Sequence, residues 1–172
     1  IIPGTKLHLL TQIQTMGIKS IVGSRVERVE ADRVVLDGAE VPSHFTVGAA
    51  GARPHPWLTQ TGLPLTDGYI NVKSDLSLAD DDDLFAAGDS AHMTHAPRPK
   101  AGVFAVRSAR VLIHNLKARL TGGQNKSFDP QKTYLKLISL GEKAAIAEKG
   151  RFSLAAPTMW RWKDRIDRKF MR

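Results

Sequence analysis

A short apolar run that ends in a glycine and an aspartate constrains the fold of this chain more than any other feature. Residues 84–87 have the length of a buried strand, and Gly88 and Asp89 follow directly. We therefore expect Asp89 at the carboxyl end of a strand, the edge at which open α/β sheets bind ligands. A carboxylate there can accept hydrogen bonds from two hydroxyl groups of a polyol. An ordinary strand that ends in a Gly-Asp turn would leave the same pattern.

A long helix is predicted soon after this turn. Residues 103–116 carry apolar side chains at helical spacing, and Pro97 and Pro99 precede them, as is typical of a helix start. The first amides of a helix are unpaired and carry partial positive charge. The opening of this helix at Ala101, Gly102 and Val103 therefore suits an electron-rich acceptor.

The chain resembles a known family at this point. The three stretches that carry the resemblance are 83–91, the Pro-Arg-Pro-Lys-Ala-Gly helix start at 97–102, and Ala-Ala-Gly-Ala-Arg-Pro at 49–54. Together they resemble the C-terminal part of an FAD-dependent pyridine nucleotide-disulphide oxidoreductase, in particular of the type II NADH dehydrogenases. The stretches 134–147 and 159–171 resemble the oxidoreductase portion found fused ahead of selenophosphate synthetase.

The resemblance implies an activity and its cofactors. The intact protein would pass hydride from NAD(P)H to FAD and then electrons to an acceptor such as a quinone. Gly88 and Asp89 would hold the ribityl chain of FAD, and the amides from Ala101 to Val103 would face the flavin ring. No catalytic side chain is implied, because the chemistry belongs to the cofactor and protein groups position it.

Two further contacts follow from the same resemblance. Ala50 and Gly51 would pass near the nicotinamide, although Ala50 replaces the threonine usual in the family and so removes a hydroxyl. Lys100 would stabilise the anion of the reduced flavin, and a lysine exposed to solvent fits the sequence equally well.

The expected fold class is α/β with an antiparallel β meander. It is a partial FAD/NAD(P)-binding fold of two dinucleotide domains plus a small C-terminal α+β unit. The expected domains are the end of the NAD(P)H-binding domain at 1–56, the end of the FAD-binding domain at 57–122, and a C-terminal hairpin and basic helix at 123–172.

Hydrophobic periodicity and turn residues predict the remaining elements. We expect a helix at 5–16, and strands at 17–22, 25–30, 33–36, 39–41, 44–51 and 69–72. A hairpin is expected from 134–140 and 144–148, with a helix as the alternative for the alanine-rich second arm.

The sequence excludes sites that depend on cysteine, and it lacks the phosphate-binding turn of a dinucleotide fold. The chain has no cysteine, so disulfides, thiolate metal sites and a redox-active cysteine pair are absent. The phosphate-binding G-x-G-x-x-G turn is also absent, so a missing N-terminal nucleotide-binding region would have to supply it. No apolar run has the length of a membrane span, which makes the cytoplasm the default location.

Two clusters invite a metal-binding interpretation. The acids at 80–83 lack the alternate spacing and the glycine of a calcium loop, so we favour an exposed loop. His92 and His95 lie on a proline-flanked loop without further clustered ligands, so we favour a structural role or a polar contact near the cofactor. No metal is expected.

The positive charge gathers at the C-terminus. From residue 117 onward there are 14 Lys and Arg against five Asp and Glu, and the whole chain has a net charge of +8. Residues 159–172 form an amphipathic helix, with Met159, Trp162, Ile166 and Phe170 on one face and Arg161, Arg165, Arg168 and Arg172 on another. The helix could pack on the flavin domain, lie on an anionic membrane surface, or dock on another domain. Nucleic acid is disfavoured because no module for it surrounds the helix.

Two alternatives to the flavoenzyme remain open. The chain could be an interaction module with a degenerate flavin fold, whose basic helix recruits a fused or partner domain beyond Arg172. It could also be a membrane-surface module, peripheral at the inner face of the membrane, in which the helix is the working part.

Overall fold

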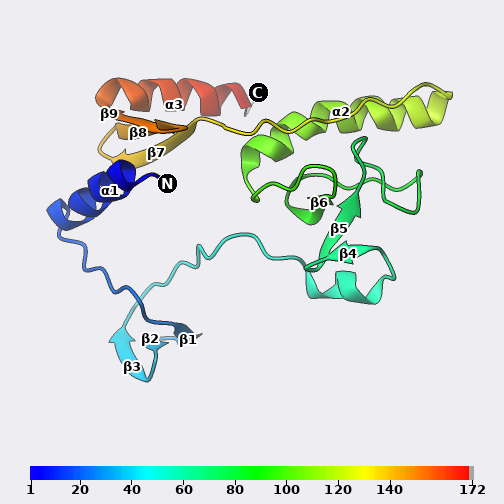
Figure 1. Cartoon of the computed structure of the whole chain (residues 1–172). Helices are drawn as coiled ribbons and strands as arrows, with labels where there is room; N and C mark the ends of the chain where they lie inside the picture. The colour runs from blue at the N-terminus through cyan, green and yellow to red at the C-terminus, as the bar shows by residue number, and fades with distance from the viewer. Residues whose placement is uncertain (171–172) are drawn as a thin grey trace. The chain divides into compact units, whose positions relative to one another are not determined.

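The computed structural model describes residues 1–170, and of Phe170 only the backbone. Figure 1 shows short strands alternating with helices along the chain. The residues form two compact units, one of 1–48 together with 133 onward, the other of 49–132. The predicted α/β class with antiparallel sheets is confirmed. The domain boundaries expected after residues 56 and 122 stay predictions.

The helices are α1 (Pro3–Thr15), α2 (Gly102–Thr121) and α3 (Pro157–Phe170), with the 3-10 helices η1 (Pro56–Gln60) and η2 (Gly88–Ser90). The strands are β1 (Val26–Val29), β2 (Arg33–Leu36), β3 (Ala39–Pro42), β4 (Leu65–Thr66), β5 (Tyr69–Val72), β6 (Ala91–Met93), β7 (Lys136–Gly141), β8 (Ala144–Lys149) and β9 (Phe152–Ala156).

The predicted antiparallel meander is formed by β1, β2 and β3. Its second hairpin closes at Asp37 and Gly38, which both adopt positive φ, of 44° and 81°. A two-residue turn with that geometry matches the twist of the flanking strands, which explains the Asp-Gly signal in the sequence. Val35 on the central strand is buried.

Two predicted strands are wrong. Residues 17–22 and 44–51 are irregular and exposed, and Phe45 keeps 85% of its surface in contact with solvent. An apolar run becomes a strand only where a neighbouring strand takes up its amides and carbonyls. Within residues 1–170, no strand pairs with either run.

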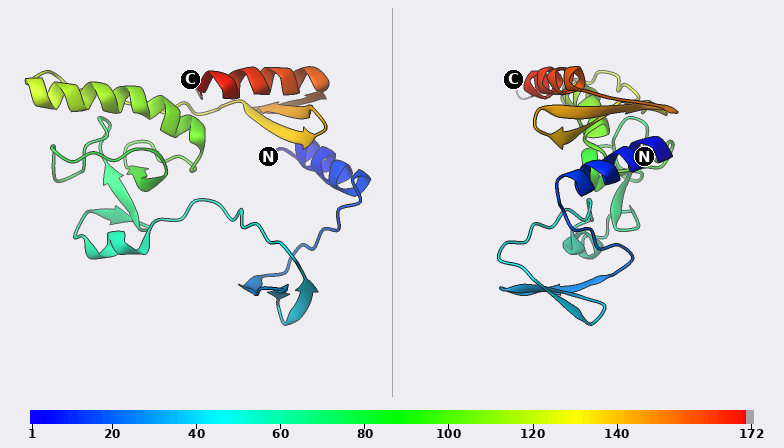
Figure 2. Two further views of the ribbon diagram at one scale, coloured as in Figure 1. Left: turned by 180° about the vertical axis from the view of Figure 1, so that it is seen from behind. Right: turned by 90° about the vertical axis from the view of Figure 1, so that its left-hand side faces the viewer.

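The C-terminal sheet has the order β7-β8-β9, and all its pairs are antiparallel. The helix α3 lies along one face of this sheet, and α1 approaches the other face with its N-terminal end (Figure 2). The central strand β8 is consequently buried from Ala145 to Glu148. The hairpin predicted at 134–148 is therefore confirmed, and the helical alternative for its second arm is wrong. The strand β9 has no counterpart in the prediction.

The predicted amphipathic C-terminal helix is confirmed, but its buried face differs. Met159 and Ile166 of the predicted face are half-buried, as are Trp160 and Lys163, whereas Trp162 is 46% exposed. The side chain of Phe170 and the residue Arg172 lie outside the described residues. Among residues 1–170, no helix is both long and apolar enough to cross a bilayer.

The second unit holds a small mixed sheet. β4 pairs with β5 in antiparallel fashion and β5 pairs with β6 in parallel. The core of this unit is a cluster of buried side chains, with α2 packed against it through Val111 and Leu112. Its buried members are Val72, Leu76, Leu78, Ala86, Ala91 and Phe128.

The strand predicted at 84–87 is wrong as a regular strand. The segment makes one bridge, between Phe85 and Ser77, and two backbone hydrogen bonds to residues 76–78. The three residues Ile70 to Val72 of β5 pair instead with β6, which begins directly after η2. Asp89 therefore precedes a regular strand, whereas the sequence placed it at a strand's carboxyl end.

The turn between β4 and β5 has no room for a side chain at Gly68. This residue has φ of 81°, and a Cβ atom would lie 2.7 Å from Cγ of Pro54. Gly62 has a similar φ of 73° with no neighbouring atom within 4 Å. We expect Gly62→Ala to cost about 1 kcal/mol of unfolding free energy through backbone strain. Gly68→Ala should cost roughly 1–3 kcal/mol more, because the Pro54 segment must move. Urea unfolding of the two variants measures the difference, and equal losses would contradict the contact.

Candidate functional site

The helix η2 packs closely against the first turn of α2. Gly88 adopts φ of 67°, and a Cβ built on it would lie 3.3 Å from Cβ of Ala105. A larger residue at position 88 would therefore strain the backbone and push η2 off the helix. The glycine thus places the exposed Asp89 beside the opening of α2.

The opening of α2 is not capped by a side chain. Ala101 occupies the N-cap position with an extended backbone, and α2 begins at Gly102 and continues through Val103. The first amides of a helix lack acceptors within the helix and carry partial positive charge. A small hollow lies in front of this opening, and it is lined by Gly88, Asp89, Lys100, Ala101 and Phe104 among others.

Lys100 is held by two neighbours. Its ammonium group lies 3.9 Å from the centroid of the Tyr69 ring and donates a hydrogen bond to the carbonyl oxygen of Ala91. Burial lowers the pKa of Lys100, and the nearby Asp89 carboxylate opposes that shift. The lysine is therefore not the freely solvated side chain of the alternative prediction.

Ala50 and Gly51 lie apart from the hollow, on an exposed irregular segment of the same unit. Gly51 adopts φ of 86°. The segment is attached to the rest of the unit at Ala52, whose carbonyl oxygen accepts a hydrogen bond of 3.0 Å from the Tyr69 hydroxyl. The hollow thus brings together Gly88, Asp89, Lys100 and Ala101 of the predicted residues. Gly102 and Val103 follow in the first turn of α2 and are not part of its lining, and neither is this pair.

The two histidines have separate surroundings. A ring nitrogen of His95 lies 3.0 Å from the carbonyl oxygen of Phe128. His92 lines a second, open groove of about 350 Å³ beside Tyr69 and Lys100. Across the residues that the structure describes, no group of three or more His, Asp or Glu side chains is arranged to hold a metal ion.

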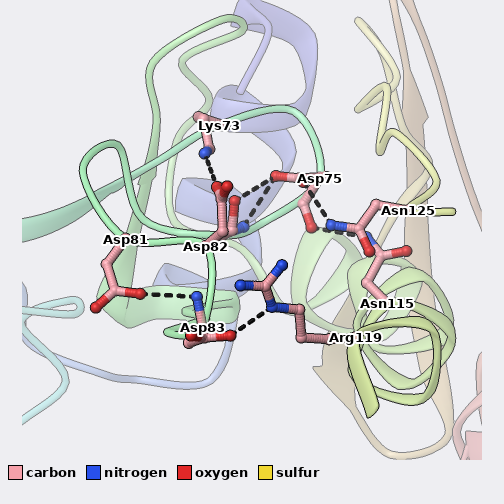
Figure 3. A network of polar contacts seen from close by, with 9 residues as sticks. Lys73, Asp75, Asp81, Asp82, Asp83, Asn115, Arg119 and Asn125 are labelled. Carbon is pink, nitrogen blue, oxygen red and sulfur yellow. Dashed lines mark hydrogen bonds and ion pairs between the residues drawn. The ribbon is translucent and has the colours of Figure 1, made fainter. Parts of the chain in front are cut away.

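The acidic run at 80–83 is an exposed loop tied down by cations (Figure 3). Lys73 forms an ion pair with Asp82, and Arg119 on α2 forms one with Asp83. Asp81 accepts a hydrogen bond of 2.7 Å from the amide of Asp83. These pairs hold the loop that leads into η2 against the far end of α2.

A buried asparagine in the same network was not identified from the sequence. Asn115 has no exposed surface, and its amide group donates to the carbonyl oxygens of Asp75 and Lys126 at 2.7 and 2.8 Å (Figure 3). Its oxygen accepts from the amide of Lys126 at 2.8 Å. Asn115 therefore fixes α2 to both flanking loops. An asparagine within an apolar helical pattern was the only signal for it.

The hollow offers groups of three kinds within one small space. Asp89 supplies an acceptor for hydroxyl groups, the opening of α2 supplies unpaired donors, and Lys100 supplies a positive charge. This donor set fits a ligand that carries both a polyol chain and an electron-rich ring edge. FAD carries both of these groups.

No protein family profile matches the chain. A curated relative is the internal alternative NAD(P)H-ubiquinone oxidoreductase A1 of potato mitochondria, which is 26% identical over 85 residues. The match covers 49% of this chain and 17% of that protein.

Three solved structures share the fold. Sulfide:quinone oxidoreductase from Aquifex aeolicus matches 99% of this chain with a TM-score of 0.73 and 15% identity. A ferredoxin reductase from Rhodopseudomonas palustris matches 88% with a TM-score of 0.62 and 22% identity. An NAD-dependent persulfide reductase from A. fulgidus matches 87% with a TM-score of 0.63 and 19% identity.

The chain covers less than half of each of these proteins: 45%, 44% and 28% of the three solved chains. The comparisons confirm the resemblance and the fold that the sequence predicted.

Proposed function

We propose that the chain is the C-terminal part of a flavin-dependent oxidoreductase that passes hydride from NADH or NADPH to FAD and electrons onward to an acceptor such as a quinone. One observation carries the proposal: Asp89 and the uncapped opening of α2 line the same hollow. Two of the similar proteins are quinone oxidoreductases, which supports the class of reaction.

Groups in the hollow and in the first turn of α2 have binding roles in this proposal. Asp89 accepts hydrogen bonds from the ribityl hydroxyls, and the amides of Gly102 and Val103 donate toward the pyrimidine edge of the ring. Lys100 adds a positive charge beside that edge. FAD, when bound, supplies the chemistry by accepting hydride and passing on electrons. The protein groups orient it and favour its reduced, negatively charged form.

We further propose that the 172-residue chain alone is inactive. The G-x-G-x-x-G turns that hold dinucleotide pyrophosphates are not in its sequence. An upstream nucleotide-binding region would supply them, and a fused or partner domain can follow Arg172. The active protein is then the full product of the coding region.

The proposal is tested by mixing that full-length product anaerobically with NADH and, separately, with NADPH. We expect one of the two to bleach the visible absorbance of bound flavin and a water-soluble quinone to restore it. Bound flavin that neither nucleotide reduces would contradict the proposed reaction.

A second proposed function concerns the basic helix. Arg161, Arg165 and Arg168 on α3 are exposed, and so is the neighbouring Trp162. A basic face with an exposed tryptophan suits the headgroup region of an anionic membrane. The protein would then be peripheral at the inner face of the membrane, which would bring it to a membrane-borne quinone.

Vesicle binding measures this second function. The full chain should sediment with vesicles of anionic lipid, and added salt should release it. Reversing Arg161, Arg165 and Arg168 to Glu should weaken binding at least tenfold, since each basic residue contributes roughly 1 kcal/mol near such a surface. Reversing the exposed Lys6, Lys19 and Lys132 makes the same change in net charge and should leave binding largely intact. Equal losses in both variants would show that net charge alone binds the vesicles.

A further inference from the structure

Tyr69 contacts two parts of the site that are otherwise separate. The face of its ring lies 3.9 Å from the Lys100 ammonium, measured to the ring centroid. Its hydroxyl donates a hydrogen bond of 3.0 Å to the carbonyl oxygen of Ala52. The first contact reaches the opening of α2, and the second reaches the segment that carries Ala50 and Gly51.

The position of Tyr69 is fixed by the turn before it. Asp67 and Gly68 adopt positive φ, of 51° and 81°, and close the hairpin between β4 and β5. Gly68 lies close to Pro54. The segment is therefore contacted twice, at Ala52 by the tyrosine hydroxyl and at Pro54 by the turn. The tyrosine side chain therefore extends from a closed hairpin turn toward the carbonyl oxygen that accepts its hydrogen bond.

The ring competes with Asp89 for the lysine. Asp89 is exposed and close enough to Lys100 to influence its charge, and a direct ion pair would draw the ammonium toward the carboxylate. Contact with the aromatic face and the Ala91 carbonyl keeps the ammonium away from that pair. Asp89 consequently stays available as an acceptor for hydroxyl groups, and the Lys100 ammonium forms no ion pair with it.

We propose that Tyr69 is a positioning residue with two separable effects on the proposed flavin site. Its ring holds the Lys100 charge beside the opening of α2, and through this charge it raises the reduction potential of the flavin. Its hydroxyl holds the Ala49–Ala52 segment, and through this segment it supports binding of the nicotinamide nucleotide. The inference rests on the proposed function, because both effects need a flavin in the hollow.

The two effects are separated by two substitutions in the full-length holoenzyme. Tyr69→Phe keeps the ring and removes the hydroxyl, whereas Tyr69→Leu removes both. The measurements are the midpoint potential of bound flavin and the concentration of NADH or NADPH that gives half the limiting rate of flavin reduction. Lys100→Met removes the charge itself, and Lys73→Met removes a charge from the same unit outside the hollow.

The expected pattern is specific. Tyr69→Phe should leave the midpoint potential unchanged and raise the half-saturating nucleotide concentration by roughly threefold to tenfold, the equivalent of one neutral hydrogen bond. Tyr69→Leu and Lys100→Met should both shift the midpoint potential to more negative values. A double variant that combines the two substitutions should shift it no further than Lys100→Met alone. Lys73→Met should leave it unchanged.

Other patterns would overturn the inference. Bound flavin whose potential does not respond to Tyr69→Leu, or additive shifts in the double variant, would show that the ring does not act through Lys100. A changed midpoint potential in Tyr69→Phe would refute the separation of the two effects. This measurement tests the proposal even if Tyr69→Leu fails to fold. Absence of flavin from the unsubstituted protein would instead count against the proposed function.

Discussion

Asp89→Ala in the full-length product is expected to raise the dissociation constant for FAD by about two to four orders of magnitude. Two hydrogen bonds to a charged carboxylate are lost, each worth roughly 1.5–3 kcal/mol. Within residues 1–170, no hydrogen bond to the Asp89 carboxylate is formed, and the side chain is exposed. The substitution should therefore leave the folding stability nearly unchanged.

The comparison variant is Asp80→Ala, which removes an equally exposed carboxylate from the acidic loop. It makes the same change in net charge and should leave the dissociation constant within a factor of about two. Titration of apoprotein with FAD, followed by quenching of flavin fluorescence, measures both values. Similar affinities for the two variants would remove Asp89 from the site.

Glu148→Gln is expected to cost about 2–4 kcal/mol of unfolding free energy in the unit that holds the C-terminal sheet. Glu148 on β8 is only 3% exposed, and its carboxylate accepts hydrogen bonds from Lys136 at 2.7 Å and from the amide of Ile2 at 2.9 Å. The substitution leaves the Lys136 ammonium without its counter-charge and weakens the attachment of α1. Glu27→Gln, at an exposed position on β1, is the matched control.

Fluorescence can report this unit separately. Two of the three tryptophans, Trp160 and Trp162, lie on α3, so a Trp57→Phe background leaves only signals from that helix. In urea, the midpoint of this signal should fall for Glu148→Gln and stay in place for Glu27→Gln. Coincident midpoints for both variants would mean that the buried pair contributes nothing measurable.

The same carboxylate predicts a pH dependence. The hydrogen bonds from Lys136 and from the amide of Ile2 lower the pKa of Glu148 from 4.5 to about 2. A group with a lowered pKa in the folded state stabilises that state above its unfolded pKa. The stabilisation, roughly 2–3 kcal/mol, should be lost as the pH falls from about 4.5 to about 2. In Glu148→Gln this part of the acid sensitivity should disappear.

Local sequence signals predicted those parts of the fold that local interactions determine. The Asp37-Gly38 turn carries its own positive-φ preference, and the helix α2 combines prolines before its start with Gly122 in the left-handed region at its end. The placement of Gly88, Asp89 and the opening of α2 followed from their closeness along the chain. The strand β6 and residues 94–101 are all that separates η2 from α2.

Pairings between distant residues were not predictable. The run at 84–87 looks like a strand by composition, but β5 pairs with the residues after the turn, and periodicity does not report the choice of partner. Tyr69 lies 17 residues from Ala52 and gave no motif. Glu148 lies 146 residues from Ile2, and its sequence context is the alanine-rich arm for which a helix was the alternative.

The flavin content of the full-length product, measured beside that of the 172-residue chain by the absorbance of released cofactor, tests the central claim most directly. The account predicts flavin in the full-length product and none in the shorter chain. Flavin in neither would contradict the flavin site at Asp89 and favour an interaction module with a degenerate flavin fold. Flavin in both would contradict the claim that the pyrophosphate-binding turns must come from outside this chain.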